Sequence, residues 1–73
     1  MDKRSFSIAG HRTSIALEPE FWAGFEAIAT ARGLSLAALV REIDEARETA
    51  NLSSAIRLAV LAWYRDGQSQ ADG

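Results

Sequence analysis

The chain has 73 residues, a formal net charge of −2, 48% hydrophobic residues and no cysteine. A chain of this length forms one small domain and buries only about 60% of the surface that its unfolded form exposes. The absence of cysteine excludes a disulfide scaffold and the cysteine-based zinc modules. Because a single hydrophobic core seldom stabilises a domain below about 70–80 residues, we expect association with a second copy.

The N-terminal segment is the only locally basic part of the chain. Residues 1–17 carry three cations and one carboxylate, a balance of +2, whereas residues 18–73 carry five basic and nine acidic side chains, a balance of −4. The charge-free stretches are shorter than the roughly 20 apolar residues of a membrane span, and no basic-then-apolar signal peptide opens the chain. We therefore expect a cytoplasmic protein that does not enter a membrane.

Alternating side chains predict a short strand near the N-terminus. Polar and apolar residues alternate over residues 12–17, as in a strand with one buried face. Upstream, Phe6 and Ile8 occupy even positions, and the change to odd positions across Gly10 predicts a bulge or a break. Residues 1–10 are therefore expected to form an extended arm.

Three helices are predicted after this strand. Pro19 suits the first position of a helix, because it lacks the N–H that would be unpaired there, and Gly33 can adopt the left-handed conformation that closes the helix. Ser35 can cap a second helix, and Asn51 or Ser53 can cap a third. A short charged connection at residues 46–50 separates these two helices, and residues 67–73 are expected to be a disordered tail.

The third predicted helix is apolar on two sides. Ile56 and Val60 belong to one apolar stripe, whereas Leu58 and Leu61 belong to another. A helix that is apolar nearly all round must be buried on both sides, which 73 residues cannot achieve alone. The strand at residues 12–17 also has no predicted mate for its backbone groups. Both features predict a homodimer, or a higher oligomer built from it, in which this strand pairs antiparallel with its own copy.

The predicted elements follow one another in an informative order. The strand leads into Leu17-Glu18-Pro19-Glu20, a helix, Gly33-Leu34-Ser35 and another helix. Over about residues 11–47 this order resembles the ribbon-helix-helix superfamily, the fold of the Arc and MetJ repressors. The runs RSFSIAGHRTSIALEPEFW and NLSSAIRLAVLAWYR are also similar to a group of short bacterial ribbon-helix-helix domains. The resemblance implies a mainly α fold, an intertwined homodimer, and a domain at residues 11–66 with one additional helix.

The resemblance also implies a bacterial transcriptional regulator that binds double-stranded DNA. In the superfamily the paired strands of a dimer enter the major groove, so the outward positions Arg12, Ser14 and Ala16 would face the bases. Arg12 could bind guanine through two hydrogen bonds, and Ala16 could only contact a thymine methyl group. Lys3 and Arg4 complete the predicted DNA-binding residues.

A helix start is the predicted phosphate site, because its unpaired N–H groups and positive dipole end attract an anion. The resemblance places this site at Leu34, Ser35 and Leu36, at the start of the second helix. The start of the third helix, at Asn51 and Ser53, also resembles the polar-capped start of the superfamily's second helix. Spacing from the strand favours Ser35, and local residue likeness favours Ser53.

Two departures from the pattern favour an alternative function. Ala16 removes one base-reading side chain, and the chain is acidic overall, whereas affinity for DNA comes largely from neutralised phosphates. The alternative is a dimer that binds a small polar metabolite, such as an amino acid, or a protein partner, near His11, Arg57, Trp63 and Tyr64. A third interpretation is an antitoxin-like module whose last helix covers a partner.

No catalytic or metal site is predicted. A nucleophile needs an oriented base within hydrogen-bond reach, and the single histidine and scattered carboxylates provide no such spacing. The carboxylates of residues 42–48 have Arg41 and Arg47 as neighbours, which indicates a solvated, salt-bridged helix surface. We therefore expect neither an enzyme nor a cofactor.

Overall fold

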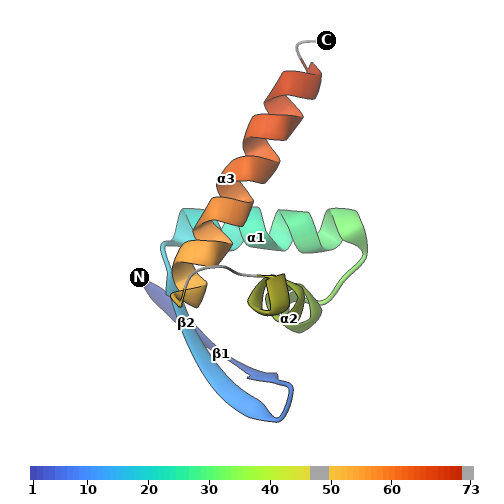
Figure 1. Ribbon diagram of the computed structural model, residues 1–73. Coiled ribbons are helices and arrows are strands. Elements are labelled where there is room, and N and C mark those ends of the chain that lie inside the picture. Colours follow the sequence, from blue (N-terminus) through green and yellow to red (C-terminus); the bar gives the residue numbers. More distant parts are fainter. Residues whose placement is uncertain (47–49, 72–73) are drawn as a thin grey trace.

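A computed structural model describes residues 1–46 and 50–71, with side chains up to residue 67. Two strands come first and three helices follow (Figure 1). This confirms the predicted mainly α ribbon-helix-helix order of elements. The five elements are β1 (Asp2–Ile8), β2 (His11–Leu17), α1 (Pro19–Arg32), α2 (Leu36–Ala46) and α3 (Leu52–Ala71).

The strands β1 and β2 form an antiparallel hairpin, the only sheet in the described part of the chain. Ile8 pairs with His11 next to the turn. The two turn residues, Ala9 and Gly10, have φ angles of 51° and 82°. Positive φ at both central positions is what a type I′ turn requires, and this turn matches the twist of paired strands. The change from even to odd apolar positions therefore marks a hairpin turn, and the predicted bulge or break is wrong.

The N-terminal segment differs from its prediction as an arm. Residues 1–10 are extended, but residues 2–8 are paired with β2 along their whole length. The prediction that β2 has no pairing strand in its own chain is therefore wrong. The signal was weak because β1 has only two large apolar residues, Phe6 and Ile8, and because Ala-Gly is not the usual type I′ turn dipeptide.

The inner face of the hairpin packs on the helices and completes one core. The indole of Trp22, 1% exposed, donates a hydrogen bond of 2.8 Å to the carbonyl oxygen of Asp2 and lies 6.1 Å from the ring of Phe6. Burial of each large apolar side chain contributes about 1.5–3 kcal/mol. The buried apolar residues are Ile8, Ile15, Leu17, Trp22, Phe25, Ile28, Ala29, Leu39, Val40, Ile56 and Val60.

The turn between α1 and α2 is built as the sequence predicts. Gly33 has a φ of 68°, and its N–H donates to the carbonyl oxygen of Thr30, while the N–H of Leu34 donates to that of Ala29. These two bonds form a Schellman motif, which satisfies carbonyls at the end of the helix. No single described helix is long and apolar enough to cross a membrane. Only α1 and α2 together reach that length, and they are bent by 98° at this turn.

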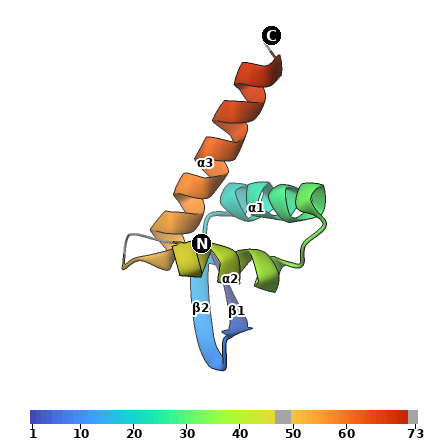
Figure 2. The same cartoon turned by 45° about the vertical axis from the view of Figure 1, so that its right-hand side comes forward.

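The helix α3 crosses α1 closely and then continues past the body of the molecule (Figures 1 and 2). At the crossing, a Cβ atom on Gly24 would lie 2.7 Å from Cγ1 of Val60, so only glycine allows this approach. The helix continues to Ala71, into the segment predicted as a disordered tail over residues 67–73, and the disorder of that segment stays a prediction. Residues compatible with a helix can extend one that packing has already nucleated. Residues 47–49 of the predicted connection, and residues 72–73, lie outside the described residues.

Candidate nucleic-acid interface

The outer face of the hairpin is a small polar surface, which we call the ribbon face. It consists of alternate residues of both strands, and directly opposite residues are paired across it. At its centre the hydroxyl oxygens of Ser5 and Ser14 lie 3.2 Å apart. All its residues are exposed except the half-buried Ala16. The pairs are Lys3 with Ala16, Ser5 with Ser14, and Ser7 with Arg12.

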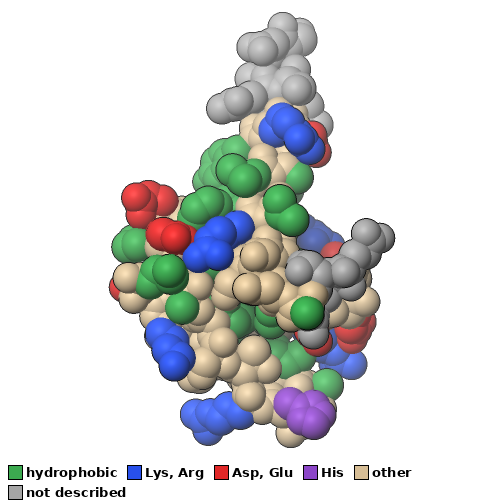
Figure 3. All heavy atoms as spheres, turned by 60° about the vertical axis from the view of Figure 1, so that its left-hand side comes forward, with side chains coloured by type: hydrophobic (Ala, Val, Ile, Leu, Met, Phe, Trp, Pro, Cys, Tyr) green, Lys and Arg blue, Asp and Glu red, His purple; other side chains and the backbone are tan. Residues whose placement is uncertain are grey.

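The ribbon face carries two cations and no carboxylate. Lys3 and Arg12 stand at opposite ends of the hairpin, about 13 Å apart along the strands at the usual rise per residue. Neither forms an ion pair with any described residue. Figure 3 shows basic side chains and the single histidine at the lowest part of the molecule, below the acidic side chains. The face is therefore an open, positively charged surface on an acidic protein.

Arg4 does not belong to the ribbon face. It lies on the inner side of β1, where its guanidinium is 4.5 Å from the centroid of the Trp22 ring and 3.6 Å from a carboxylate oxygen of Glu26. A guanidinium over a tryptophan ring is a favourable cation–π arrangement that fixes the strand on α1. We therefore leave Arg4 out of the proposed interface.

Both candidate helix starts are capped by side chains. The hydroxyl of Ser35 accepts a 3.1 Å hydrogen bond from the N–H of Ala38, and the side-chain oxygen of Asn51 accepts one of the same length from Ser54. Ser53 is thus inside the first turn of α3 and is not its cap. Leu34 and Leu36, on either side of Ser35, pack partly against the core. The phosphate site at Leu34–Leu36 stays a prediction, as does its alternative at the start of α3.

The outer side of α3 is an unpartnered apolar stripe. Ile56 and Val60 face the core and are 0% and 4% exposed, as expected for one of the two predicted stripes. On the other side Leu58 is 63% exposed and Leu61 is 56% exposed, next to the half-buried Ala62. We call Leu58, Leu61 and Ala62 the α3 stripe. In Figure 3 hydrophobic side chains accordingly follow the protruding part of the molecule.

A family model described as "Ribbon-helix-helix domain" matches residues 1–64. The chain belongs to the ribbon-helix-helix family. The match includes β1 and most of α3, which lie outside residues 11–47, where the order of elements carried the resemblance. Members of this family are typically DNA-binding regulators, which supports a function of that general kind. No curated protein and no solved structure matches the sequence.

The residues of the alternative ligand site are not assembled in this ribbon-helix-helix domain. His11 is exposed beside the hairpin turn, and the guanidinium of Arg57 donates two hydrogen bonds to the carboxylate of Glu18. Tyr64 contacts the position where α3 crosses α1, whereas Trp63 lines a cleft on another side of α3. Among the described residues no group of three or more His, Cys, Asp or Glu side chains could hold a metal ion.

Two residues of the ribbon face, Ser5 and Ser7, were missed by sequence reasoning. Their signal was their spacing from Lys3, because residues 3, 5 and 7 alternate with the apolar residues of the same segment. The arm prediction hid this signal, since a segment without a strand partner has no defined outer face.

The ion pair of Glu18 and Arg57 joins the end of β2 to α3 and predicts a pH effect. The hydrogen bond from Arg57 holds the pKa of Glu18 below its ordinary value of 4.5. A carboxylate whose pKa is lower in the folded state stabilises the fold above its ordinary pKa and loses this effect as the pH falls. At about pH 7 we expect the wild-type protein to have a higher midpoint temperature of thermal unfolding than Glu18→Gln. At about pH 3 the difference between the two midpoint temperatures should be smaller.

The control for this pH effect is Asp66→Asn, which removes an exposed carboxylate that lies outside the first turn of a helix and forms no ion pair with a described residue. Its midpoint should follow that of wild type at both pH values. An equal loss of stability for Glu18→Gln at both pH values would show that the ion pair has no part in it.

Proposed function

We propose that the chain is a homodimeric, sequence-specific DNA-binding regulator whose ribbon face contacts double-stranded DNA in the major groove. The observation that carries this proposal is the chemistry of the ribbon face. Although the chain has a net charge of −2, this face carries two cations and three hydroxyls and no carboxylate. Cations neutralise phosphates, and arginine and hydroxyl side chains read base edges.

The free edge of β2 supports pairing with a second copy. In a β-turn the residues on either side of the turn share a hydrogen bond, and bonded and unbonded pairs then alternate along an antiparallel hairpin. Ile8 and His11 form the bonded pair beside the turn. The backbone N–H and C=O groups of Arg12, Ser14 and Ala16 therefore point away from β1, where no other described segment bonds them. An antiparallel β2–β2 pairing about a two-fold axis would satisfy them.

The α3 stripe supports the same dimer. Figures 1 and 2 place α3 beside β2, whereas α2 lies toward β1, and the contacts between elements agree. The stripe and the free edge of β2 therefore lie on the same side of the hairpin, where one partner can cover both. Burial of the exposed parts of Leu58 and Leu61 in each subunit would contribute several kcal/mol, at about 1–2 kcal/mol for each side chain.

The dimensions of the resulting sheet assign different roles to the two strands. Four strands in the order β1–β2–β2–β1 span about 14 Å between the outer strands, at about 4.8 Å per spacing. The major groove is about 12 Å wide, so the two central strands enter the groove and the outer strands lie over the phosphates. Arg12 and Ser14 of β2 then face base edges, with Ala16 against a thymine methyl group. Lys3 of β1 faces the phosphate backbone.

Two variants, Arg12→Ala and Lys3→Ala, test this assignment. After selection of duplexes from a random pool at low and at high salt, Arg12→Ala should weaken binding to the selected duplex by about 1–3 kcal/mol and relax its sequence preference. Lys3→Ala should weaken binding to all duplexes and lower the salt slope by about one unit for each lysine, or about two for a dimer. Titration by fluorescence anisotropy measures both quantities.

The matched control is Arg41→Ala, which removes an exposed cation of α2 that pairs with Glu45. It should leave affinity, preference and salt slope unchanged. If Arg12→Ala changes neither affinity nor sequence preference, the ribbon face does not read DNA.

A further inference from the structure

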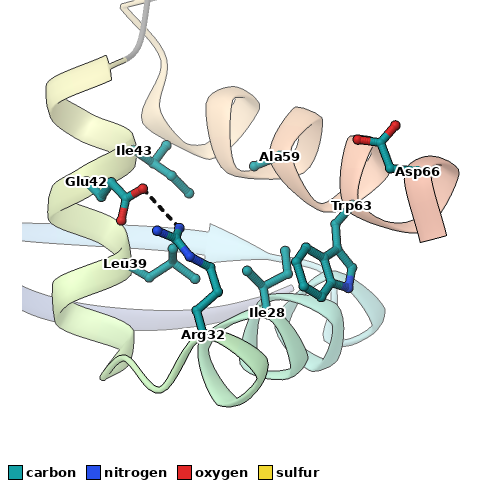
Figure 4. A pocket seen from close by; sticks show the side chains of 8 residues that line it. All are labelled: Ile28, Arg32, Leu39, Glu42, Ile43, Ala59, Trp63 and Asp66. Carbon is teal, nitrogen blue, oxygen red and sulfur yellow. Dashed lines mark ion pairs between the residues drawn. The ribbon is translucent and has the colours of Figure 1, made fainter. Parts of the chain in front are cut away.

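A cleft opens between the three helices. Its volume is about 360 Å³, within the range of small-molecule sites. Figure 4 shows one wall from each helix, with the Trp63 side chain of α3 beside Ile28 of α1. The lining residues are Ile28, Arg32, Leu39, Glu42, Ile43, Ala59, Trp63 and Asp66.

The cleft combines an apolar floor with an acidic rim. Ile28 and Leu39 are buried in the floor, and Trp63 is 39% exposed at the side. At the rim, Nη1 of Arg32 and a carboxylate oxygen of Glu42 are 2.9 Å apart, so these two charges compensate one another (Figure 4). Asp66 forms no ion pair with a described residue, which leaves the cleft with a net charge of −1.

We propose that this cleft binds a small organic cation, namely an ammonium group attached to an apolar body. Asp66 lies three residues after Trp63 on α3, and side chains at this spacing are neighbours on a helix. The ammonium group pairs with the carboxylate of Asp66 at the rim, while the apolar body lies beside the ring of Trp63, which points toward Ile28 (Figure 4). The apolar body packs on Ile28 and Leu39, where it displaces water from an apolar floor.

The charge of the rim selects a cation over an anion. To pair with Arg32, an anionic ligand would have to break the ion pair between Arg32 and Glu42. The uncompensated carboxylate of Asp66 would also repel it. A neutral ligand would gain only the apolar contacts. The cleft is lined by none of the residues of the ribbon face or of the α3 stripe, so its ligand does not depend on DNA binding.

The experiment uses three probes with the same phenyl body and different charges. They are 2-phenylethylammonium, 2-phenylethanol and 3-phenylpropanoate, titrated into the whole chain by calorimetry. Nuclear magnetic resonance follows the indole N–H of Trp63 in parallel, and Trp63→Phe assigns its signal. We expect saturable binding of the ammonium with a dissociation constant between about 10 µM and 1 mM. The alcohol should bind at least about five-fold more weakly, and the carboxylate should not saturate.

Two variants with the same loss of one charge locate the site. Asp66→Asn should weaken binding of the ammonium at least about five-fold, since it removes the uncompensated carboxylate. Glu20→Gln, on the first turn of α1, should bind like wild type. Both residues are exposed, so both variants should keep the wild-type circular dichroism spectrum. The proposal is overturned by an ammonium that does not shift the Trp63 signal up to about 10 mM, by equal binding of the alcohol, or by an unchanged affinity in Asp66→Asn.

Discussion

Replacing Ser14 by proline is expected to separate the proposed dimer while the hairpin of each chain stays formed. The N–H of Ser14 points away from β1, so its loss removes no bond of the hairpin. In the dimer each chain would lose one bond to the other β2 strand, and the acceptor carbonyls would be left unsatisfied. Two such losses cost about 2 kcal/mol or more, which is at least about thirty-fold in the dissociation constant.

The matched control for this effect is Ser5→Pro. Ser5 lies directly opposite Ser14 in the hairpin, so proline imposes the same backbone restriction there. Its N–H faces the outer edge of β1, where proline is tolerated and where the proposed dimer makes no bond. Sedimentation equilibrium should therefore give a dimer for Ser5→Pro and a monomer for Ser14→Pro. If both variants stay dimeric, β2 does not pair with its copy.

Replacing Leu58 by glutamate should also dissociate the proposed dimer, through the helical part of the interface. In an isolated chain Leu58 is 63% exposed, so the substitution should change the free energy of unfolding of the monomer by no more than about 0.5 kcal/mol. In the dimer two carboxylates would replace two buried leucines. Because only the exposed 63% of each leucine can be buried, the lost burial alone is about 2–4 kcal/mol per dimer, at least about thirty-fold in the dissociation constant.

The control for this substitution is Ala27→Glu, which adds the same charge to an exposed position of α1. It should leave the molar mass by light scattering unchanged, whereas Leu58→Glu should halve it. Loss of DNA binding should accompany loss of the dimer, because one hairpin offers two of the four cations. A Leu58→Glu chain with the mass of wild type would show that the α3 stripe is not an interface.

The helical part of the fold could be predicted because its signals are local. Pro19 and Gly33 are start and stop residues whose chemistry acts on their own turn, and both occupy the expected positions. The two-sided hydrophobicity of α3 was also readable, since Ile56 is buried and Leu58 is exposed, as a helix with one partner inside the chain requires.

The strand β1 could not be predicted with the same ease, because strand pairing depends on residues elsewhere in the chain. Ser5 and Ser7 are weak signals for a strand, and the turn between the strands lacks asparagine. Tertiary contacts with α1 hold β1 in place. The indole of Trp22 donates a hydrogen bond to the carbonyl oxygen of Asp2, and Arg4 stacks on the same indole. The end of α3 was missed for the opposite reason, because polar residues with glycine resemble a tail.

Part of the candidate interface followed from the sequence alone. Period-two alternation placed Arg12 and Ser14 on the outer face of β2, and the structure places them there. The same reasoning needs a strand before it can assign a face, so Arg4 was included although it points inward. The cleft beside Trp63 joins three helices through Gly33 and the Gly24 crossing, and no local pattern reports such an arrangement.

The most direct test of the proposed function is to map which backbone amides respond to a selected duplex by nuclear magnetic resonance. We expect the largest shifts at the amides of the ribbon face, and we expect them to vanish as salt is raised. These amides belong to Lys3, Ser5, Ser7, Arg12, Ser14 and Ala16. Shifts confined to the cleft or to the α3 stripe, or no shift at any salt concentration, would contradict the proposed function.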